Sequence, residues 1–197
     1  MRRRGVVVAA ALVVAASMAV PAARAGVYAA EHTRAVAYWY LPTADDDVYR
    51  LYRAEVVSVR NLLTGAVSSQ ASIITDRCTE KPIAPNQTLF ACGDGRRERT
   101  TRDAELEIAA DMSSGTARIR LRGKTHVVYF EGPAEGGAYE MYDSCSETDH
   151  RVVAGTFTNM DRAHGRVLGK RLDRPVGSDL DHAWLMRGFG TWCDEDG

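Results

Sequence analysis

The sequence lacks the short motifs by which many enzymes and metalloproteins are recognised. It has no G-x-S-x-G nucleophile elbow, no H-E-x-x-H zinc motif, no EF-hand loop and no glycine-rich phosphate loop. Its cysteines do not have the paired C-x-x-C spacing of zinc sites. These absences favour a non-catalytic protein without a cofactor. They do not exclude a catalytic triad, which is defined by geometry and needs no motif.

Long apolar runs are absent after residue 25, and this determines the expected organisation of the chain. Residues 2–4 are all arginine, an uncharged apolar stretch of about 16 residues follows, and residues 23–25 are Ala-Arg-Ala. A membrane-spanning helix needs roughly 20 residues, so the stretch is too short to be one. We expect residues 1–25 to be a cleaved signal peptide of bacterial type. Residues 26–197 would then be a single secreted domain with no membrane anchor.

An excess of positive charge is also absent once that segment is removed. Cleavage takes away four arginines and no acid, which leaves 21 basic and 26 acidic side chains and a net charge of −5. A mildly acidic domain does not attract nucleic acid or anionic membranes over its whole surface. We therefore expect no nucleic-acid partner, and the length predicts one domain, taken here as a monomer.

Cysteine is scarce, but its number is even. In an oxidising compartment four cysteines predict two disulfides, and sequence alone leaves three pairings open. We favour Cys78–Cys92 together with Cys145–Cys193, because the first pair closes a short loop rich in proline, asparagine and glycine.

No segment has the periodicity of an amphipathic helix, and the chain consists instead of short strand patterns between turn residues. Residues 34–41 form the first expected strand, with Tyr38 and Tyr40 on one face and Trp39 on the other. Residues 132–137 are expected to form a loop. About nine strands result, several of them apolar on both faces. This predicts an all-β fold, a single antiparallel β-barrel or β-sandwich, and the pattern does not distinguish the two.

The clearest local pattern is a β-hairpin over residues 104–122. Two glutamates alternate with apolar residues before a turn at residues 111–115, and three arginines alternate with apolar residues after it. The hairpin places a row of acids beside a row of bases, and such cross-strand pairs stabilise by about 0.2–1 kcal/mol each. We interpret the charges as a neutralised outer face. They are Glu105, Glu107, Arg118, Arg120 and Arg122.

Aromatic residues supply the candidate ligand-binding side chains. Tyr38, Trp39, Tyr40 and Tyr129 could line a cavity or present a surface on which a sugar stacks. The alternative is that they fill the core, as aromatic residues commonly do in a β-domain of this size.

Acidic residues next to a histidine supply the candidate metal site. Asp179, Asp181 and His182 lie close together in a glycine-containing loop. Carboxylates in a loop can hold Ca²⁺, and a histidine beside them could hold a transition metal. The alternative is a solvated turn, where aspartate suits the backbone geometry. The basic run at residues 96–102 could contact an anionic partner, but Glu98 and Asp103 dilute its charge.

These patterns lead to a hypothesis rather than an identification. The leading interpretation is a secreted binding domain whose ligand is a small apolar molecule, a glycan or a protein. One alternative is a secreted hydrolase whose catalytic residues come together from distant strands. Another is a secreted inhibitor or effector that acts on a second protein.

Overall fold

The structure, a computed structural model, is an antiparallel β-sheet of eleven strands and describes residues 27–45, 47–84, 87–93, 95–144, 150–175 and 182–193. This confirms the all-β prediction, with eleven strands where about nine were expected. The described residues include no helix that could span a membrane. The strands are β1 (Val27–Pro42), β2 (Val48–Asn61), β3 (Val67–Ala84), β4 (Gln87–Cys92), β5 (Arg97–Thr101), β6 (Ala104–Ile108), β7 (Ser114–Leu121), β8 (Lys124–Ser144), β9 (His150–Val167), β10 (Lys170–Pro175) and β11 (Ala183–Cys193).

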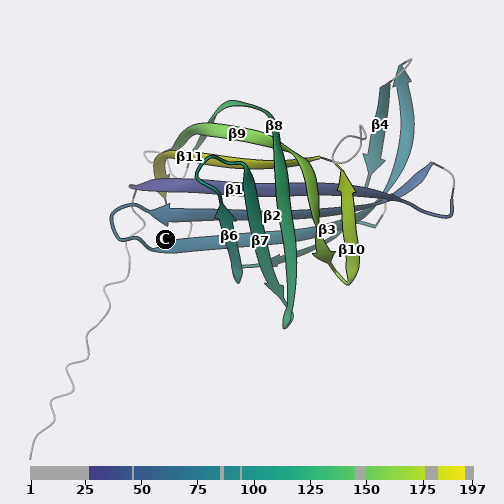
Figure 1. The fold of residues 1–197 in the computed structure, drawn as a ribbon, viewed down its shortest axis with the longest axis horizontal. Helices are drawn as coiled ribbons and strands as arrows, with labels where there is room; N and C mark the ends of the chain where they lie inside the picture. Colours follow the sequence, from purple (N-terminus) through teal and green to yellow (C-terminus); the bar gives the residue numbers. More distant parts are fainter. Residues whose placement is uncertain are drawn as a thin grey trace, which may run out of the picture.

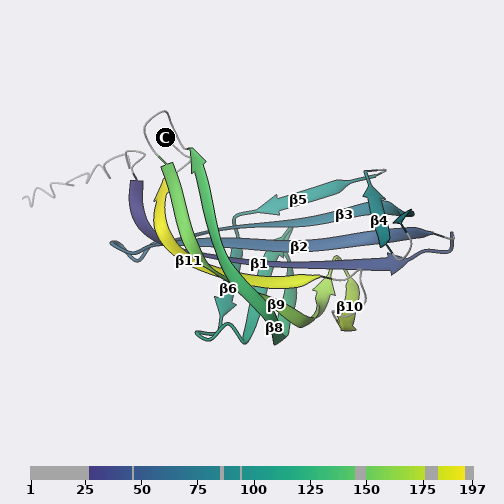
Figure 2. The same ribbon diagram turned by 90° about the horizontal axis from the view of Figure 1, so that it is seen from above.

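The sheet folds over on itself to make two layers. Its strand order is β4-β3-β2-β1-β11-β9-β8-β7-β6, with β5 added to β3 and β10 to β9. Figure 1 shows β1, β2 and β3 running along the molecule while β6, β7 and β8 cross them steeply. In Figure 2 the long strands β8, β9 and β11 curve strongly, as in orthogonal packing, where strands that bend make the corners. Hydrogen bonding does not close the described strands into a barrel, so the arrangement is sandwich-like.

Strand β8 continues through the segment for which the sequence predicted a loop, and that prediction was wrong. The register between β8 and β9 shifts between Pro133 and Gly136, but pairing resumes on both sides. A Cβ atom on Gly136 would lie 2.4 Å from the Phe157 carbonyl oxygen. The glycine is therefore present because two backbones approach closely, and not because the chain turns.

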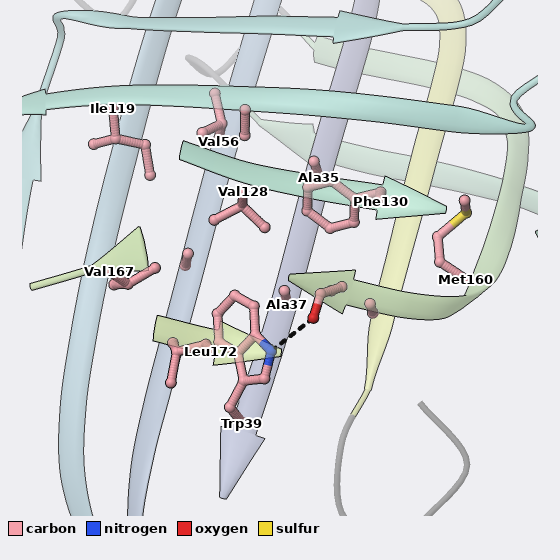
Figure 3. Packing of buried hydrophobic residues seen from close by; sticks show 14 of the residues in the cluster. Ala35, Ala37, Trp39, Val56, Ile119, Val128, Phe130, Met160, Val167 and Leu172 are labelled. Atoms are coloured by element: carbon pink, nitrogen blue, oxygen red, sulfur yellow. Dashed lines mark hydrogen bonds between the residues drawn. The ribbon is translucent and has the colours of Figure 1, made fainter. Parts of the chain in front are cut away.

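The core lies between the layers and is filled with side chains (Figure 3). The faces predicted for the first strand are confirmed: Trp39 is 1% exposed and points into the core, whereas Tyr38 and Tyr40 are half-buried on the opposite face. The indole Nε1 of Trp39 donates to the carbonyl of Ala163, 3.0 Å away, and thereby joins β1 to β9. Other fully buried side chains of this cluster are Val56, Ile73, Ile119, Val128, Phe130, Met160, Val167, Leu172 and Leu185.

The predicted hairpin is present as β6 and β7. Its charges form cross-strand ion pairs on the outer face: Arg120 lies 3.4 Å from Glu105, and Arg118 lies 3.3 Å from Glu107. Each of these side chains is more than one-third exposed. Ion pairs of that kind contribute about 0–1 kcal/mol, so they do not hold the hairpin on the sheet.

Arg187 on β11 holds this hairpin against the other layer. Its guanidinium donates to the carbonyls of Ile108 (2.8 Å), Ala109 (3.3 Å) and Ala110 (3.2 Å), and it lies 3.3 Å from the carboxylate of Glu31. The Arg187 and Glu31 side chains are 21% and 17% exposed. One largely buried side chain thus satisfies three carbonyls at the end of β6 and in the turn that follows it.

The favoured disulfide between Cys78 and Cys92 is confirmed. The two residues are direct partners in the β3–β4 hairpin, which projects from the body of the sheet (Figure 1). Of the second predicted pair, Cys145 lies outside the described residues and only the backbone of Cys193 is described. The Cys145–Cys193 bond therefore remains a prediction.

Candidate functional site

Two tight turns meet at one end of the sandwich. The β7–β8 turn consists of Arg122 and Gly123, with φ angles of 51° and 73°, and the β9–β10 turn consists of Leu168 and Gly169, with φ angles of 48° and 81°. Positive φ at both central residues is the geometry of type I′ hairpin turns, in which asparagine or aspartate is preferred at the first position. Arginine and leucine occupy that position here, although a left-handed backbone costs such residues about 1–2 kcal/mol.

These turns and the nearby strand β5 enclose an open cleft. One part has a volume of about 600 Å³ and a second part a volume of about 340 Å³, and the two share Arg99 and Leu168 in their lining. Asp76 is the one acid among the described residues that line them. The cationic residues that line the cleft are Arg50, Arg77, Arg97, Arg99, Arg122, Lys124 and Arg166.

Strand register explains why arginines from β5 face the cleft. Arg99 is the direct partner of Ile73 on β3, and Arg97 is the partner of Thr75. Residues directly opposite each other in a sheet share a face, so both arginines lie on the face that carries the core. The core-facing surface is apolar at Ile73 and becomes basic at the outer strand.

Little of this positive charge is neutralised. Arg77 pairs with Asp45 at 3.0 Å, and its backbone N–H donates to the Asp76 carboxylate at 2.7 Å. Nη1 of Arg99 is buried and has no hydrogen-bond partner in the part of the chain that the structure describes. A buried donor without a partner costs about 1–3 kcal/mol. Within the same residues no ion pair joins the other lining cations to an acid; these are Arg50, Arg97, Arg122, Lys124 and Arg166.

His126 forms part of the cleft wall and connects the two turns. It is 5% exposed, and its Nδ1 accepts a hydrogen bond of 3.3 Å from the backbone N–H of Leu168. Burial lowers the pKa of His126 below its ordinary value of 6.5, and the positive charges of Lys124 and Arg99 lower it further. A hydrogen bond with the Arg166 backbone acts in the opposite direction and raises the pKa. The imidazole is therefore neutral at pH 7.

The low pKa of His126 predicts acid sensitivity. As the pH falls through about 6.5, the unfolded chain takes up this proton first and the folded protein takes it up only at lower pH, so stability decreases in that window. Urea unfolding from pH 8 to pH 5 should show a smaller acid-induced loss for His126→Gln than for the unaltered protein. Equal losses in the two proteins would contradict the assignment.

The strained position of Arg122 predicts a stabilising substitution. Arg122→Asn should raise the free energy of unfolding by up to about 1 kcal/mol, because asparagine tolerates the left-handed conformation. Chemical denaturation of the two proteins measures the difference. A variant that is less stable than the unaltered protein would refute the strain argument.

The four aromatic candidates do not form one site. Tyr38 is covered by the guanidinium of Arg53, 5.2 Å from its ring centre, on the face of β1 away from the core. Trp39 is buried in the core, and Tyr129 is 42% exposed on the second layer, where it stacks on His164 at 5.2 Å. The structure therefore separates Trp39 from Tyr129, and both of them from Tyr38 and Tyr40.

Of the three candidate metal ligands, Asp179 and Asp181 lie outside the described residues. His182 is exposed just before β11, and its carbonyl accepts a hydrogen bond of 2.7 Å from the backbone N–H of Tyr38. Among the residues that are described, no group of histidine, cysteine and acidic side chains could hold a metal ion. The metal hypothesis therefore stays a prediction.

The cleft was missed by reasoning from sequence. The basic run at residues 96–102 was considered as a contact for an anionic partner and discounted because acids dilute its charge, yet Arg97 and Arg99 of that run line the cleft together with residues from distant strands. The signal that could have indicated it is the pair of short turns in which Arg122 and Leu168 replace the asparagine that such turns prefer.

Comparisons with known proteins identify no relative, so the function has to be inferred from the fold and the site. A scan against models of known protein families gives no match, and a search of the curated proteins finds no similar sequence. The fold and site define a disulfide-containing, antiparallel β-sandwich-like domain with a basic cleft at one end.

Proposed function

We propose that the protein is an exported, non-catalytic binding domain that takes an anionic ligand in the basic cleft. The observation that carries the proposal is the set of lining cations that form no ion pair with an acid among the described residues, together with Arg99, which lines both parts of the cleft; the set is Arg50, Arg97, Arg122, Lys124 and Arg166. An oxyanion in the cleft would offset the repulsion among these cations and accept charge-assisted hydrogen bonds from them.

The chemistry of the lining favours phosphate, sulfate or carboxylate groups. Arginine presents its donors as a planar fork that matches such oxyanions, and these charge-assisted hydrogen bonds are stronger than neutral ones. A volume of about 600 Å³ is within the range of small-molecule sites. A concave surface lined by one sign of charge also concentrates oppositely charged ligands near it.

Other ligand classes have less support. The space between the layers is filled by the core side chains, which leaves the surface cleft as the better place for a ligand. Duplex nucleic acid needs an extended basic surface. Outside the cleft the arginines of β7 are paired with acids, as Arg118 is with Glu107 and Arg120 with Asp103.

Export is the second part of the proposal. Residues 1–25 lie outside the described residues, so the support comes from their charge and apolar pattern and from the disulfide, since disulfides persist in oxidising compartments. Intact mass measurement of protein recovered from the culture medium of an expressing bacterium tests it. A mature chain that begins at Gly26 is expected, whereas an uncleaved chain retained in the cytoplasm would contradict export.

Thermal unfolding at constant ionic strength tests the binding proposal. Phosphate, sulfate or citrate should raise the melting temperature relative to chloride, because a ligand present at 100 times its Kd stabilises by about 2.7 kcal/mol. Arg99→Gln should abolish the increase. Arg118→Gln, a change on the outer face of the hairpin, is the matched control and should retain it. Equal melting temperatures in all four salts, or an equal increase in the Arg99→Gln protein, would refute the proposal.

A further inference from the structure

The cleft consists of two lobes that meet at Arg99 and Leu168. The turn lobe, of about 600 Å³, includes Arg122 and Lys124 in its lining, and the sheet lobe, of about 340 Å³, includes Arg50 and Arg97. Each lobe thus has cations of its own that form no ion pair with an acid in the described parts of the chain, three in the turn lobe, where Arg166 is the third, and two in the sheet lobe. Arg99 is common to both.

The two lobes differ in the charge they already contain. Asp76 places a negative charge at the sheet lobe and Arg77 is neutralised by Asp45, so the net positive charge of this lobe depends on Arg50, Arg97 and the shared Arg99. Among the described residues, no acid lines the turn lobe. A single small anion in either lobe would leave the cations of the other lobe without a counter-charge.

We infer that the ligand carries two or more oxyanion groups on a short linear backbone, one group in each lobe, with Arg99 between them. This inference rests on the proposed function and specifies its ligand class. Leu168 lines both lobes beside Arg99 and offers an apolar contact to the part of the ligand that links the two charged groups. The shared chemistry is that of covalently linked phosphate or sulfate groups.

Titration calorimetry with three probes tests the inference. Orthophosphate has one group, tripolyphosphate is a linear phosphate chain, and a multiply sulfated disaccharide carries sulfates on a sugar backbone. At constant ionic strength, at least one linear probe should bind with one-to-one stoichiometry and about tenfold or more tighter than orthophosphate, because it adds charge-assisted contacts in the second lobe. Tighter binding of tripolyphosphate would indicate a phosphate ligand, and tighter binding of the disaccharide would indicate a sulfated glycan.

Variants in each lobe separate this inference from the proposed function. Lys124→Gln in the turn lobe and Arg97→Gln in the sheet lobe should each weaken the linear probe several-fold, and Arg99→Gln should weaken every probe. Arg118→Gln should change none of these affinities. If the linear probes bind no tighter than orthophosphate, or if only one lobe matters, the two-lobe ligand is refuted while anion binding stands. If no probe binds, the proposed function itself fails.

Discussion

Replacing Trp39 by alanine is expected to lower the free energy of unfolding by about 3–5 kcal/mol. The side chain is 1% exposed at the centre of the cluster that joins the layers, and alanine would leave a cavity there. The change would also leave the Ala163 carbonyl without its donor. The total stability of a domain is about 5–15 kcal/mol, so the variant would lose a large fraction of it. Urea unfolding followed by fluorescence and by circular dichroism measures the loss.

Two control variants separate volume from hydrogen bonding. Trp39→Phe keeps most of the ring but removes the Nε1 donor, so we expect a loss of about 1–3 kcal/mol. Trp184→Ala also removes a tryptophan, but from the face of β11 that points away from the core. There the ring is half-buried beneath the guanidinium of Arg34, 5.1 Å from the ring centre. Its cost should be clearly smaller than that of Trp39→Ala. Equal costs for the two tryptophans would contradict the placement of Trp39 in the core.

Replacing Arg187 by leucine is expected to lower the free energy of unfolding by about 2–4 kcal/mol. The variant would leave the carbonyls of Ile108, Ala109 and Ala110 without this donor, and would leave Glu31 largely buried without its partner on β11. Hydrogen exchange should show the loss of protection first in β6 and β7, because Arg187 connects that hairpin to the other layer.

Matched arginine variants show whether the effect comes from hydrogen-bonding geometry or from charge. Arg187→Lys keeps the charge but cannot present the same planar set of donors, so it should recover only part of the stability. Arg120→Gln removes an arginine whose partners Glu105 and Asp103 are both exposed, and should cost less than about 1 kcal/mol. If Arg187→Lys were as stable as the unaltered protein, the role of the guanidinium fork would be refuted.

Local alternation predicted the parts of the fold that depend on nearest neighbours. The hairpin of β6 and β7, the two faces of β1 around Trp39 and the Cys78–Cys92 bond all follow from residues close together in sequence. The segment at 132–137 was predicted wrongly because glycine has two uses. Gly136 lets two strands approach more closely than a Cβ atom would allow. Composition alone cannot distinguish a glycine with this role from a glycine in a turn.

The cleft could not be predicted because its charges converge only through the folding of the sheet. Arg50, Arg99 and Lys124 lie on β2, β5 and β8, and no local pattern relates them. In sequence the basic run is diluted by Glu98. In the structure Arg97 and Arg99 share the core-facing side, whereas Glu98 is the partner of Ile74 and faces the other way.

The pairing of β1 with β11 has a consequence for how the chain folds. Val27 is the partner of Cys193, so the middle of the sheet joins two segments that lie far apart in the sequence. Closing so long a loop is slow, and proteins dominated by such distant contacts fold more slowly than those with local ones. Until residues 183–193 have emerged from the ribosome, β1 and β9 each lack a neighbour. The nascent polypeptide therefore cannot complete this sheet before β11 is available, and its exposed strand edges are open to wrong pairing until that strand is in place.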